Sequence, residues 1–166
     1  MSHKYKVLRI ISTLNPKYGG PTNAIIDSSL MLKKQGFVVH ILTCDTVENN
    51  FVKKKIKVIN KGPSLLGRYG FNIKISVWLN KNKNKYDVFI IHGIWGFNSL
   101  LARLILKNYY VFIHGFLDPF FKKNFLKRIK KQIYWFCIEK KNLIKARSIL
   151  LTSKGENESL KKTFVN

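Results

Sequence analysis

The sequence predicts an α/β fold with a doubly wound, mostly parallel sheet of about six strands and helices on both faces. Short runs rich in Val, Ile and Phe recur along the chain, as is typical of strands buried on both faces of a sheet. Longer segments suited to helices separate these runs. Two of the runs, residues 86–95 (YDVFIIHGIW) and 109–119 (YYVFIHGFLDP), contain the same His-Gly step where the apolar run ends. The alternation favours right-handed crossovers between parallel strands.

The first strand and the first helix have clear boundary signals. We expect a strand over Lys6–Ser12 and a loop over residues 13–20. Pro21 opens a helix, because a missing N–H costs nothing at the first helical position. The helix is expected to run to about Gln35, and Gly36 provides the left-handed residue that ends it.

The later elements continue the alternation. Further strands are expected over residues 37–43, 56–59, 87–91, 110–113 and 149–152. Further helices are expected over residues 71–79, 98–106, 121–147 and 156–163. Apolar spacing supports the segment 98–106, whereas the periodicity of 71–79 is weak. The polar run NKNKNK at Asn80–Lys85 is expected to be a solvated turn.

The strand order 3-2-1-4-5-6 would place a ligand crevice beyond the carboxyl ends of strands one and four. The residues expected to meet there are Gly19 and Gly20 after strand one, His92 to Trp95 after strand four, and His114 to Asp118 after strand five. Ser153, after strand six, is expected farther out. The two histidines are therefore assigned to one candidate site.

The step Gly19-Gly20-Pro21 ahead of a helix resembles an anion cradle, in which backbone N–H groups and the helix N-terminus face a phosphate. An ordinary strand-to-helix turn needs glycine for geometry alone, and both interpretations stay open. The spacing is not GxGxxG, so the dinucleotide fingerprint fails, although Asp45 falls where its ribose-binding acid would sit.

The two histidines are the candidates for chemistry. An imidazole at a strand end can hydrogen-bond a hydroxyl or a phosphate near neutral pH. A lone histidine is more often a satisfied structural residue, but the repeated His-Gly step favours a functional role for His114 and leaves His92 open. Asp118 is either part of the site or a turn residue before Pro119.

The charge of the chain points to negative partners. Its 166 residues, 46% of them apolar, suit one domain, and a net charge of +23 favours nucleic acid, anionic lipid or phosphorylated ligands. The abundance of Lys, Asn and Ile is also what an A+T-rich genome produces without selection for binding. The basic helix expected over residues 121–147 either lies against an anionic membrane or packs its apolar stripe on the sheet.

Several chemistries have no sequence support. Cys44 and Cys137 lack CxxC spacing, which argues against a metal site or a redox motif and fits a reducing cytoplasmic setting. Walker A, HExxH, GxSxG and paired-cysteine zinc motifs do not occur. The N-terminal apolar stretch is too short for a signal peptide, and no apolar run approaches the roughly 18 residues of a spanning helix.

Taken together, four ordered segments resemble the N-terminal half of the family 4 glycosyltransferases, which are retaining enzymes of the GT-B architecture. These segments are residues 11–43 (ISTLNPKYGGPTNAIIDSSLMLKKQGFVVHILT), 90–95 (IIHGIW), 112–121 (FIHGFLDPFF) and 146–160 (ARSILLTSKGENESL). In that family, two Rossmann-like domains face each other across a cleft. The N-terminal domain mainly binds the acceptor, and the C-terminal domain holds a nucleotide sugar.

The resemblance implies that Gly19 and Gly20 lie near the donor diphosphate and that His114 faces the transferred sugar in the catalytic position. From their places after the strands, Asp118 is expected to act with His114. His92, Trp95 and Ser153 are expected, on the same ground, to contact the acceptor or substrate. The expected partners are a nucleotide sugar carrying a hexose-type group and a glycan or lipid-linked acceptor. Neither a cofactor nor a metal is expected, because helix dipoles and basic side chains can neutralise the diphosphate.

The family's second domain, with its Glu-x7-Glu donor signature, has no counterpart in residues 1–166. We therefore expect a fragment, a truncated gene product or one half of a split enzyme, inactive alone and partnered by a separate C-terminal domain. Two rival hypotheses are a non-catalytic basic module that binds nucleic acid or anionic membrane, and a Rossmann-like oxidoreductase, against which the glycine pattern argues. The expected location is cytoplasmic, with peripheral attachment to the inner face of the plasma membrane as an extension.

Overall fold

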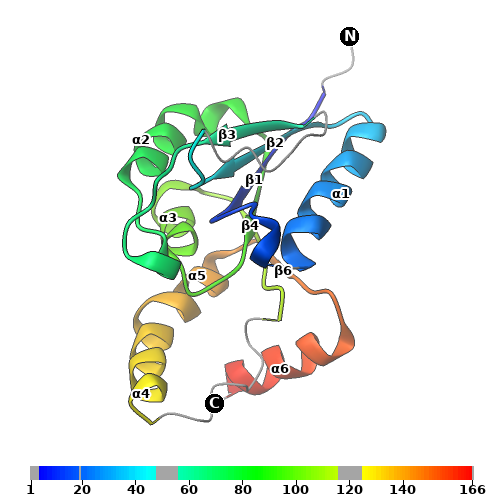
Figure 1. The fold of residues 1–166 in the computed structure, drawn as a ribbon. Coiled ribbons are helices and arrows are strands. Elements are labelled where there is room, and N and C mark those ends of the chain that lie inside the picture. Colours follow the sequence, from blue (N-terminus) through cyan, green and yellow to red (C-terminus); the bar gives the residue numbers. More distant parts are fainter. Residues whose placement is uncertain (1–3, 19, 48–55, 116–124, 166) are drawn as a thin grey trace.

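The structure, a computed structural model, describes residues 4–18, 20–47, 56–115 and 125–165. Within these residues a sheet of six parallel strands has the order β3-β2-β1-β4-β5-β6 (Figure 1). The strands are β1 (Lys6–Ile11), β2 (Val38–Thr43), β3 (Lys57–Asn60), β4 (Val88–His92), β5 (Tyr110–Phe112) and β6 (Ser148–Leu150). The predicted doubly wound, Rossmann-like α/β fold is confirmed.

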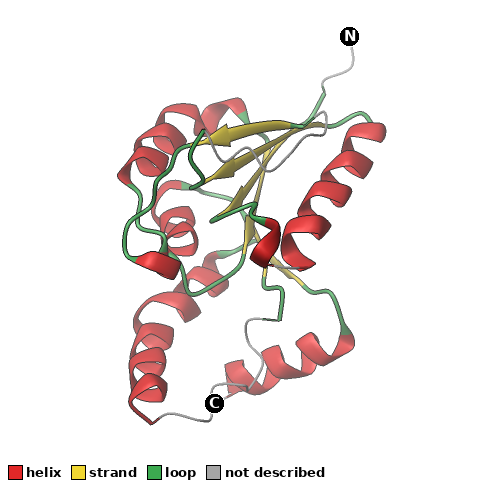
Figure 2. Ribbon diagram, in the orientation of Figure 1, coloured by secondary structure: helices red, strands yellow, loops and turns green. Residues whose placement is uncertain are grey.

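Helices cover both faces of this sheet (Figure 2). Helix α1 (Gly20–Lys34) packs on one face, and α2 (Ile73–Asn82), α3 (Phe97–Ile105) and α5 (Lys140–Lys145) pack on the other. Helices α4 (Phe125–Tyr134) and α6 (Lys154–Val165) lie beyond the carboxyl ends of the strands, at the bottom of Figure 1. The shorter helical turns are η1 (Pro16–Tyr18), η2 (Gly67–Tyr69), η3 (Lys83–Lys85) and the π-helical η4 (Trp135–Glu139).

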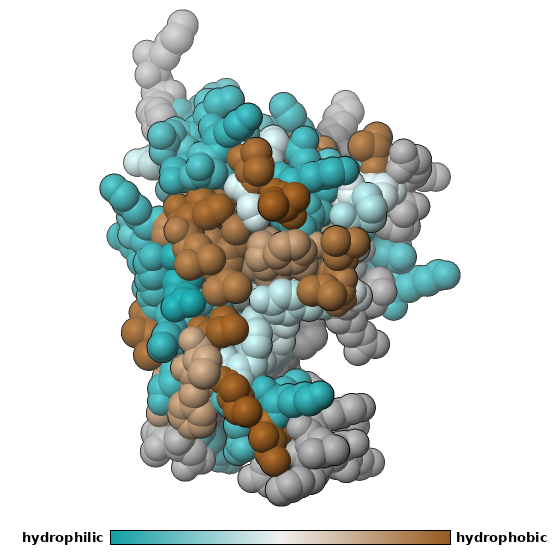
Figure 3. All heavy atoms as spheres, turned by 90° about the vertical axis from the view of Figure 1, so that its left-hand side faces the viewer, coloured by the Kyte–Doolittle hydropathy of each residue, from teal (hydrophilic) through white to brown (hydrophobic). Residues whose placement is uncertain are grey.

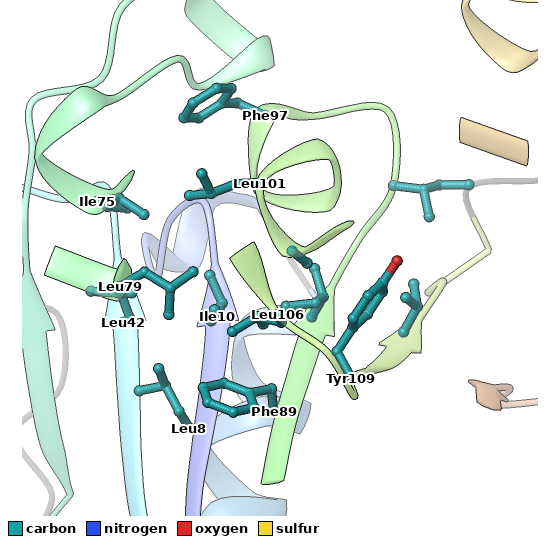
Figure 4. Packing of buried hydrophobic residues seen from close by; sticks show 14 of the residues in the cluster. Leu8, Ile10, Leu42, Ile75, Leu79, Phe89, Phe97, Leu101, Leu106 and Tyr109 are labelled. Carbon is teal, nitrogen blue, oxygen red and sulfur yellow. The ribbon is translucent and has the colours of Figure 1, made fainter. Parts of the chain in front are cut away.

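Alternate residues of β1 face opposite layers, as the period of two in a strand requires. The larger apolar cluster lies on the α2 and α3 side, and its members include Leu8, Ile10, Leu42, Ile75, Leu79, Phe97, Leu101 and Tyr109 (Figure 4). The smaller cluster lies under α1 and consists of Ile11, Leu14, Ile25, Ile41 and Ile56. Each such side chain, fully buried, contributes ~1.5–3 kcal/mol to stability. Arg9 also faces α1, so a charged residue lies on this buried side.

The end of α1 follows the sequence prediction. Gly36 has a left-handed φ of 92°, which glycine adopts without a steric penalty. Its N–H donates to the carbonyl of Lys33 at 3.0 Å, and the N–H of Phe37 donates to that of Leu32 at 3.1 Å. These two bonds form a Schellman motif, which satisfies carbonyls at the helix terminus.

Helix α2 extends beyond its expected end. Asn72 caps its start by accepting a hydrogen bond from the N–H of Ile75 at 3.2 Å. The run Asn80–Lys85, expected to be a solvated turn, instead forms the last turn of α2 and the 3-10 turn η3. The run contains neither glycine nor proline, so its backbone has no residue that ends a helix.

The helix expected over about residues 121–147 is present from Phe125 to Lys145, but it differs from a single regular α-helix in two respects. The π-helical turn η4 interrupts it between α4 and α5, and the helix ends at Lys145, with Ala146 already extended. Residues 116–124 lie outside the described part of the chain. The π-helical turn begins at Trp135 and ends at Glu139, and both side chains are buried by contacts with other elements. Local periodicity carries no information about such tertiary contacts.

Glu139 joins η4 to the start of α3. Its side chain is fully buried, and its carboxylate accepts hydrogen bonds from the hydroxyl of Ser99 and from the N–H of Trp95, the latter at 3.2 Å. Burial raises the pKa of Glu139, and the hydrogen bonds from Ser99 and Trp95 oppose that rise. The carboxylate therefore joins both the backbone just before α3 and the side chain of Ser99 in α3 to η4.

We expect Glu139→Ala to lower the free energy of unfolding by about 2–4 kcal/mol, because two buried donors lose their acceptor. Glu139→Gln keeps one acceptor oxygen and nearly the same shape, so its loss should be about half as large or less. Urea unfolding followed by circular dichroism measures both variants. An alanine variant as stable as the parent chain would contradict this role.

Candidate functional site

The two histidines lie in direct contact at the carboxyl edge of the sheet. His92 is the last residue of β4, and His114 follows β5 by two residues. Nδ1 of His92 and Nε2 of His114 are 2.8 Å apart. The predicted meeting of the two His-Gly steps is therefore seen in the structure. Their roles in binding and catalysis stay predictions.

Arg9 supports this pair from the inside of the fold. Its Nε donates to Nε2 of His92 at 3.1 Å. Its Nη1 is within hydrogen-bond distance of three α1 acceptors, which are the carbonyl of Ile25 (3.1 Å), the hydroxyl of Ser28 (2.6 Å) and that of Ser29 (2.9 Å). Arg9 is only 3% exposed, and its partners among the described residues are all uncharged. Burial lowers the pKa of Arg9 to about 10, so the side chain stays cationic at neutral pH.

Aromatic stacking fixes the planes of both imidazoles. The Phe112 ring is stacked with the His114 ring at a centroid distance of 4.5 Å and with the His92 ring at 5.6 Å. His114 has a left-handed φ of 49°, and Gly115 follows with a φ of 73°. This turn brings the His114 ring back to Phe112. A left-handed backbone at a residue other than glycine is strained, and such strain is concentrated at functional sites.

The surroundings of the pair favour neutral imidazoles. Burial, followed by the charges of Arg9 and His114, holds the pKa of His92 well below its ordinary value. Burial also lowers the pKa of His114, while Glu156 of α6 acts to raise it and Arg9 to lower it. Arg9, His92 and His114 form a series of hydrogen-bonded side chains. At neutral pH, Arg9 is therefore the only one of these three side chains that carries a full positive charge.

The N-terminus of α1 points toward the same edge of the sheet. Arg9 is bonded to the stretch of α1 from Ile25 to Ser29, and α1 runs antiparallel to β1 (Figure 1). Gly20, five residues before Ile25, therefore lies roughly 7 Å closer to the carboxyl edge. A side chain added at Gly20 would meet nothing within 4 Å, so the space beside its backbone is open. Gly19 lies outside the described residues.

Trp95 packs toward α4 and η4. Its backbone φ is 66°, and its ring contacts Trp135 and Tyr134 at centroid distances of 5.8 and 6.1 Å. The ammonium of Lys131 lies 4.9 Å from the Trp95 ring centroid, a cation–π geometry. The structure therefore assigns to Trp95 a packing role that the sequence prediction of substrate contact did not include.

Ser153 forms the N-terminal cap of α6. Its hydroxyl accepts from the N–H of Glu156 at 3.2 Å, and the Glu156 carboxylate accepts from the N–H of Thr152 at 2.6 Å. This exchange is a variant of the capping box. Thr152 and Ser153 are thereby drawn into the start of α6, so β6 ends at Leu150, two residues before its expected end. Asp118, the remaining predicted residue, lies outside the described part of the chain.

Sequence reasoning missed two contributors to the site. Arg9 interrupts an otherwise apolar strand, and a charge inside a strand buried on both faces is a signal that could have identified it. Glu156 is preceded at three residues by Ser153, which is the capping-box spacing. Asp45, considered as a ribose ligand, instead accepts hydrogen bonds from Thr13, Leu14 and Thr43, which join the ends of β1 and β2.

In the part of the chain that the structure describes, no group of three or more His, Cys, Asp or Glu side chains is placed to hold a metal ion. Nor does any helix in this part have the length and apolar character needed to span a bilayer. Compared with known proteins, the chain matches no protein-family model and no curated protein.

The depressed pKa of His92 makes stability depend on pH. An unfolded chain protonates this histidine near pH 6.5, but the folded chain does not, so unfolding takes up a proton and stability falls as pH drops below about 6.5. The slope approaches ~1.4 kcal/mol per pH unit for one proton. His114 and His40, whose pKa values are also lowered, act in the same direction, while Glu139 acts in the opposite one.

We expect His92→Gln to reduce the slope of unfolding free energy against pH by about one proton between about pH 5 and pH 6.5. Urea titrations at several pH values, on the parent chain and the variant, give this difference. The contributions of His40 and Glu139 are present in both proteins and largely cancel. Equal slopes would show that His92 is protonated in the folded chain.

Proposed function

We propose that this chain is the acceptor-side domain of a retaining, nucleotide-sugar-dependent glycosyltransferase, with its site at the carboxyl ends of β1, β4 and β5. The observation that carries this proposal is the contact of His92 with His114 at the carboxyl ends of β4 and β5, next to the point between β1 and β4 where the strand order changes direction. In open α/β sheets, ligands bind in this crevice. The ordered resemblance to family 4 glycosyltransferases supports the reaction class.

The geometry suits such a reaction in three ways. The open backbone at Gly20 and the N-terminus of α1 can approach a diphosphate, whose charge favours helix N-termini. His114, half-buried just beyond the carboxyl end of β5, can hydrogen-bond a sugar or phosphate oxygen. Retention without a protein nucleophile would have the acceptor hydroxyl attack on the face of the departing diphosphate, with positioning and electrostatics supplying the rate. A second domain would hold most of the nucleotide, as in the resembled family.

We expect residues 1–166 by themselves to bind nucleotide sugars weakly and at the His114–Gly20 edge. Titration of the ¹⁵N-labelled chain with a panel of nucleotide sugars should shift the signals of His114 and Gly20, while His40, at the amino end of the sheet, stays unchanged. Gly20→Val should weaken this response and Gly20→Ala should do so less, because valine occupies more of the open space.

The same titration separates the rival functions. A response to a nicotinamide dinucleotide and to no nucleotide sugar would support an oxidoreductase and contradict the proposal. Tight, steeply salt-dependent binding of RNA would support a nucleic-acid module. Turnover of a nucleotide sugar by residues 1–166 alone would refute the need for a second domain.

A second candidate function, attachment to an anionic membrane, has its own observation. The apolar residues of the helical segment α4–η4–α5 do not all pack on the sheet. Trp135 and Leu143 are buried. The exposed apolar side chains are Ile129 (37% exposed), Ile133 (60%) and Phe136 (52%). Figure 3 shows apolar surface on the side of the molecule that carries α2 and α4. Lysines flank the exposed stripe, and the ammonium of Lys140 lies 5.7 Å from the Phe136 ring centroid. Apolar side chains set among lysines suit an anionic bilayer surface.

We expect the chain to bind vesicles that contain anionic lipid and to be released as salt rises, since each lysine near such a surface contributes about 1 kcal/mol. Combining Ile133→Ser with Phe136→Ser should weaken binding. The matched control is Met31→Ser, which removes a 63% exposed side chain from α1 on the opposite face. Vesicle co-sedimentation measures all three proteins. Binding to neutral vesicles as strong as to anionic ones, or equal loss in the control, would contradict this function.

A further inference from the structure

The hydrogen-bond chain behind His114 determines where its proton lies. The guanidinium of Arg9 has only donors, so Nε2 of His92, 3.1 Å from Arg9 Nε, must be an acceptor. A neutral imidazole has one donor and one acceptor, so the proton of His92 is on Nδ1. That N–H faces Nε2 of His114 at 2.8 Å, which must then accept. The proton of neutral His114 is therefore on Nδ1.

We propose that Arg9 and His92 are positioning residues that hold His114 in its Nδ1–H tautomer, so that the site presents a hydrogen-bond donor to an oxygen acceptor on the ligand. A general base needs an unprotonated nitrogen that faces the ligand. In His114 the unprotonated nitrogen, Nε2, is occupied by His92. His114 therefore binds and orients a ligand oxygen rather than removing its proton.

Protons on Nε2 of His92 and Nε2 of His114, the opposite tautomers, are disfavoured at both histidines. A proton on Nε2 of His92 would set two N–H groups against each other across the 3.1 Å contact with Arg9. A doubly protonated His114 would require His92 to accept at Nδ1 and so to carry its proton on Nε2, toward Arg9. Burial, together with the charge of Arg9, also disfavours a second positive charge on His114, although Glu156 favours it.

The buried charge of Arg9 polarises the series of hydrogen bonds that runs from Arg9 through His92 to His114. Each donor in a sequence of hydrogen bonds is polarised by the one behind it, so the guanidinium makes the terminal N–H of His114 a stronger donor. The partners of Arg9 among the described residues are an imidazole, a carbonyl and two hydroxyls, none of which neutralises it. An electron-rich oxygen, from a phosphoryl group or a sugar hydroxyl, is the chemistry that fits this donor. The ligand part of the inference rests on the proposed function, but the tautomer does not.

Long-range ¹H–¹⁵N correlation of the imidazole signals, at a pH above the ordinary histidine pKa, measures the tautomers directly. We expect His92 and His114 of the parent chain both to carry the proton on Nδ1. His40, which pairs with Tyr86 across a 2.9 Å contact in another part of the fold, serves as an internal reference. A proton on Nε2 of His114 in the parent chain overturns the proposal, whatever the behaviour of any variant.

Two variants test whether Arg9 sets the tautomer. Arg9→Met should remove the donor to His92 and move His114 toward a mixture of tautomers, while Arg9→Lys, which keeps a donor, should restore the Nδ1–H form in part. Ser28→Ala is the matched control, because it removes one hydrogen bond of Arg9 and leaves the bond to His92 intact. An unchanged His114 tautomer in a folded Arg9→Met variant would overturn the role of Arg9.

Titration of the parent chain with inorganic pyrophosphate and, separately, with a methyl hexoside tests the ligand chemistry. A shift of the His114 Nδ1–H signal with pyrophosphate assigns the donor to a phosphoryl oxygen, and a shift with the hexoside assigns it to a sugar oxygen. A response to neither overturns the ligand part of the inference. A tautomer as expected, combined with no response to any nucleotide sugar, would instead remove the proposed function.

Discussion

The burial of one positive charge, that of Arg9, organises the region of the fold that carries the candidate site. A guanidinium in an apolar interior is costly unless its N–H groups are satisfied. Three of its acceptors belong to α1 and one belongs to His92. Satisfying Arg9 therefore fixes α1 against β1 and, in the same step, fixes the imidazole at the end of β4. The position of the α1 N-terminus and the orientation of His114 both follow from this constraint.

Glu139, a second buried ionisable group, joins separate elements by hydrogen bonds on the other side of the sheet. Glu139 accepts from Ser99 and from the backbone of Trp95, and so holds the loop after β4 against η4. The residues just beyond β4 are thus held from two directions, with His92 bonded toward α1 and Trp95 toward η4. This division explains why two residues only three positions apart, both predicted to contact substrate, have different surroundings. Catalytic and binding groups need such rigid support to keep their geometry.

The lysines of the α4–η4–α5 segment lie next to exposed apolar side chains. A lysine-rich surface alone is compatible with ordinary solvation, because lysine side chains are commonly exposed. The exposure of Ile133 and Phe136 among lysines is less easily explained by solvation, since it leaves apolar area in water. The buried half of the same helical segment, at Trp135, instead packs on Phe164 of α6 at a centroid distance of 5.5 Å. One segment therefore contributes both to the core and to an exposed apolar surface among lysines, which is the basis of the proposed membrane attachment.

The sequence by itself predicted the doubly wound α/β fold class, the end of α1 at Gly36 and the proximity of His92 to His114. Those features depend on local patterns, namely apolar runs, glycine positions and the repeated His-Gly step, combined with the handedness of parallel crossovers. The sequence did not determine the length of α2, the π-helical turn η4 or the structural roles of Trp95 and Ser153. Two further predicted site residues, Gly19 and Asp118, lie outside the described residues. Nor did the sequence identify Arg9 as the partner of His92, because that pair is separated by 83 residues in the chain and is joined only when β1 and β4 become neighbours. The tertiary structure alone decided which buried donors meet which acceptors, since a buried polar group must find its partner wherever the fold places one.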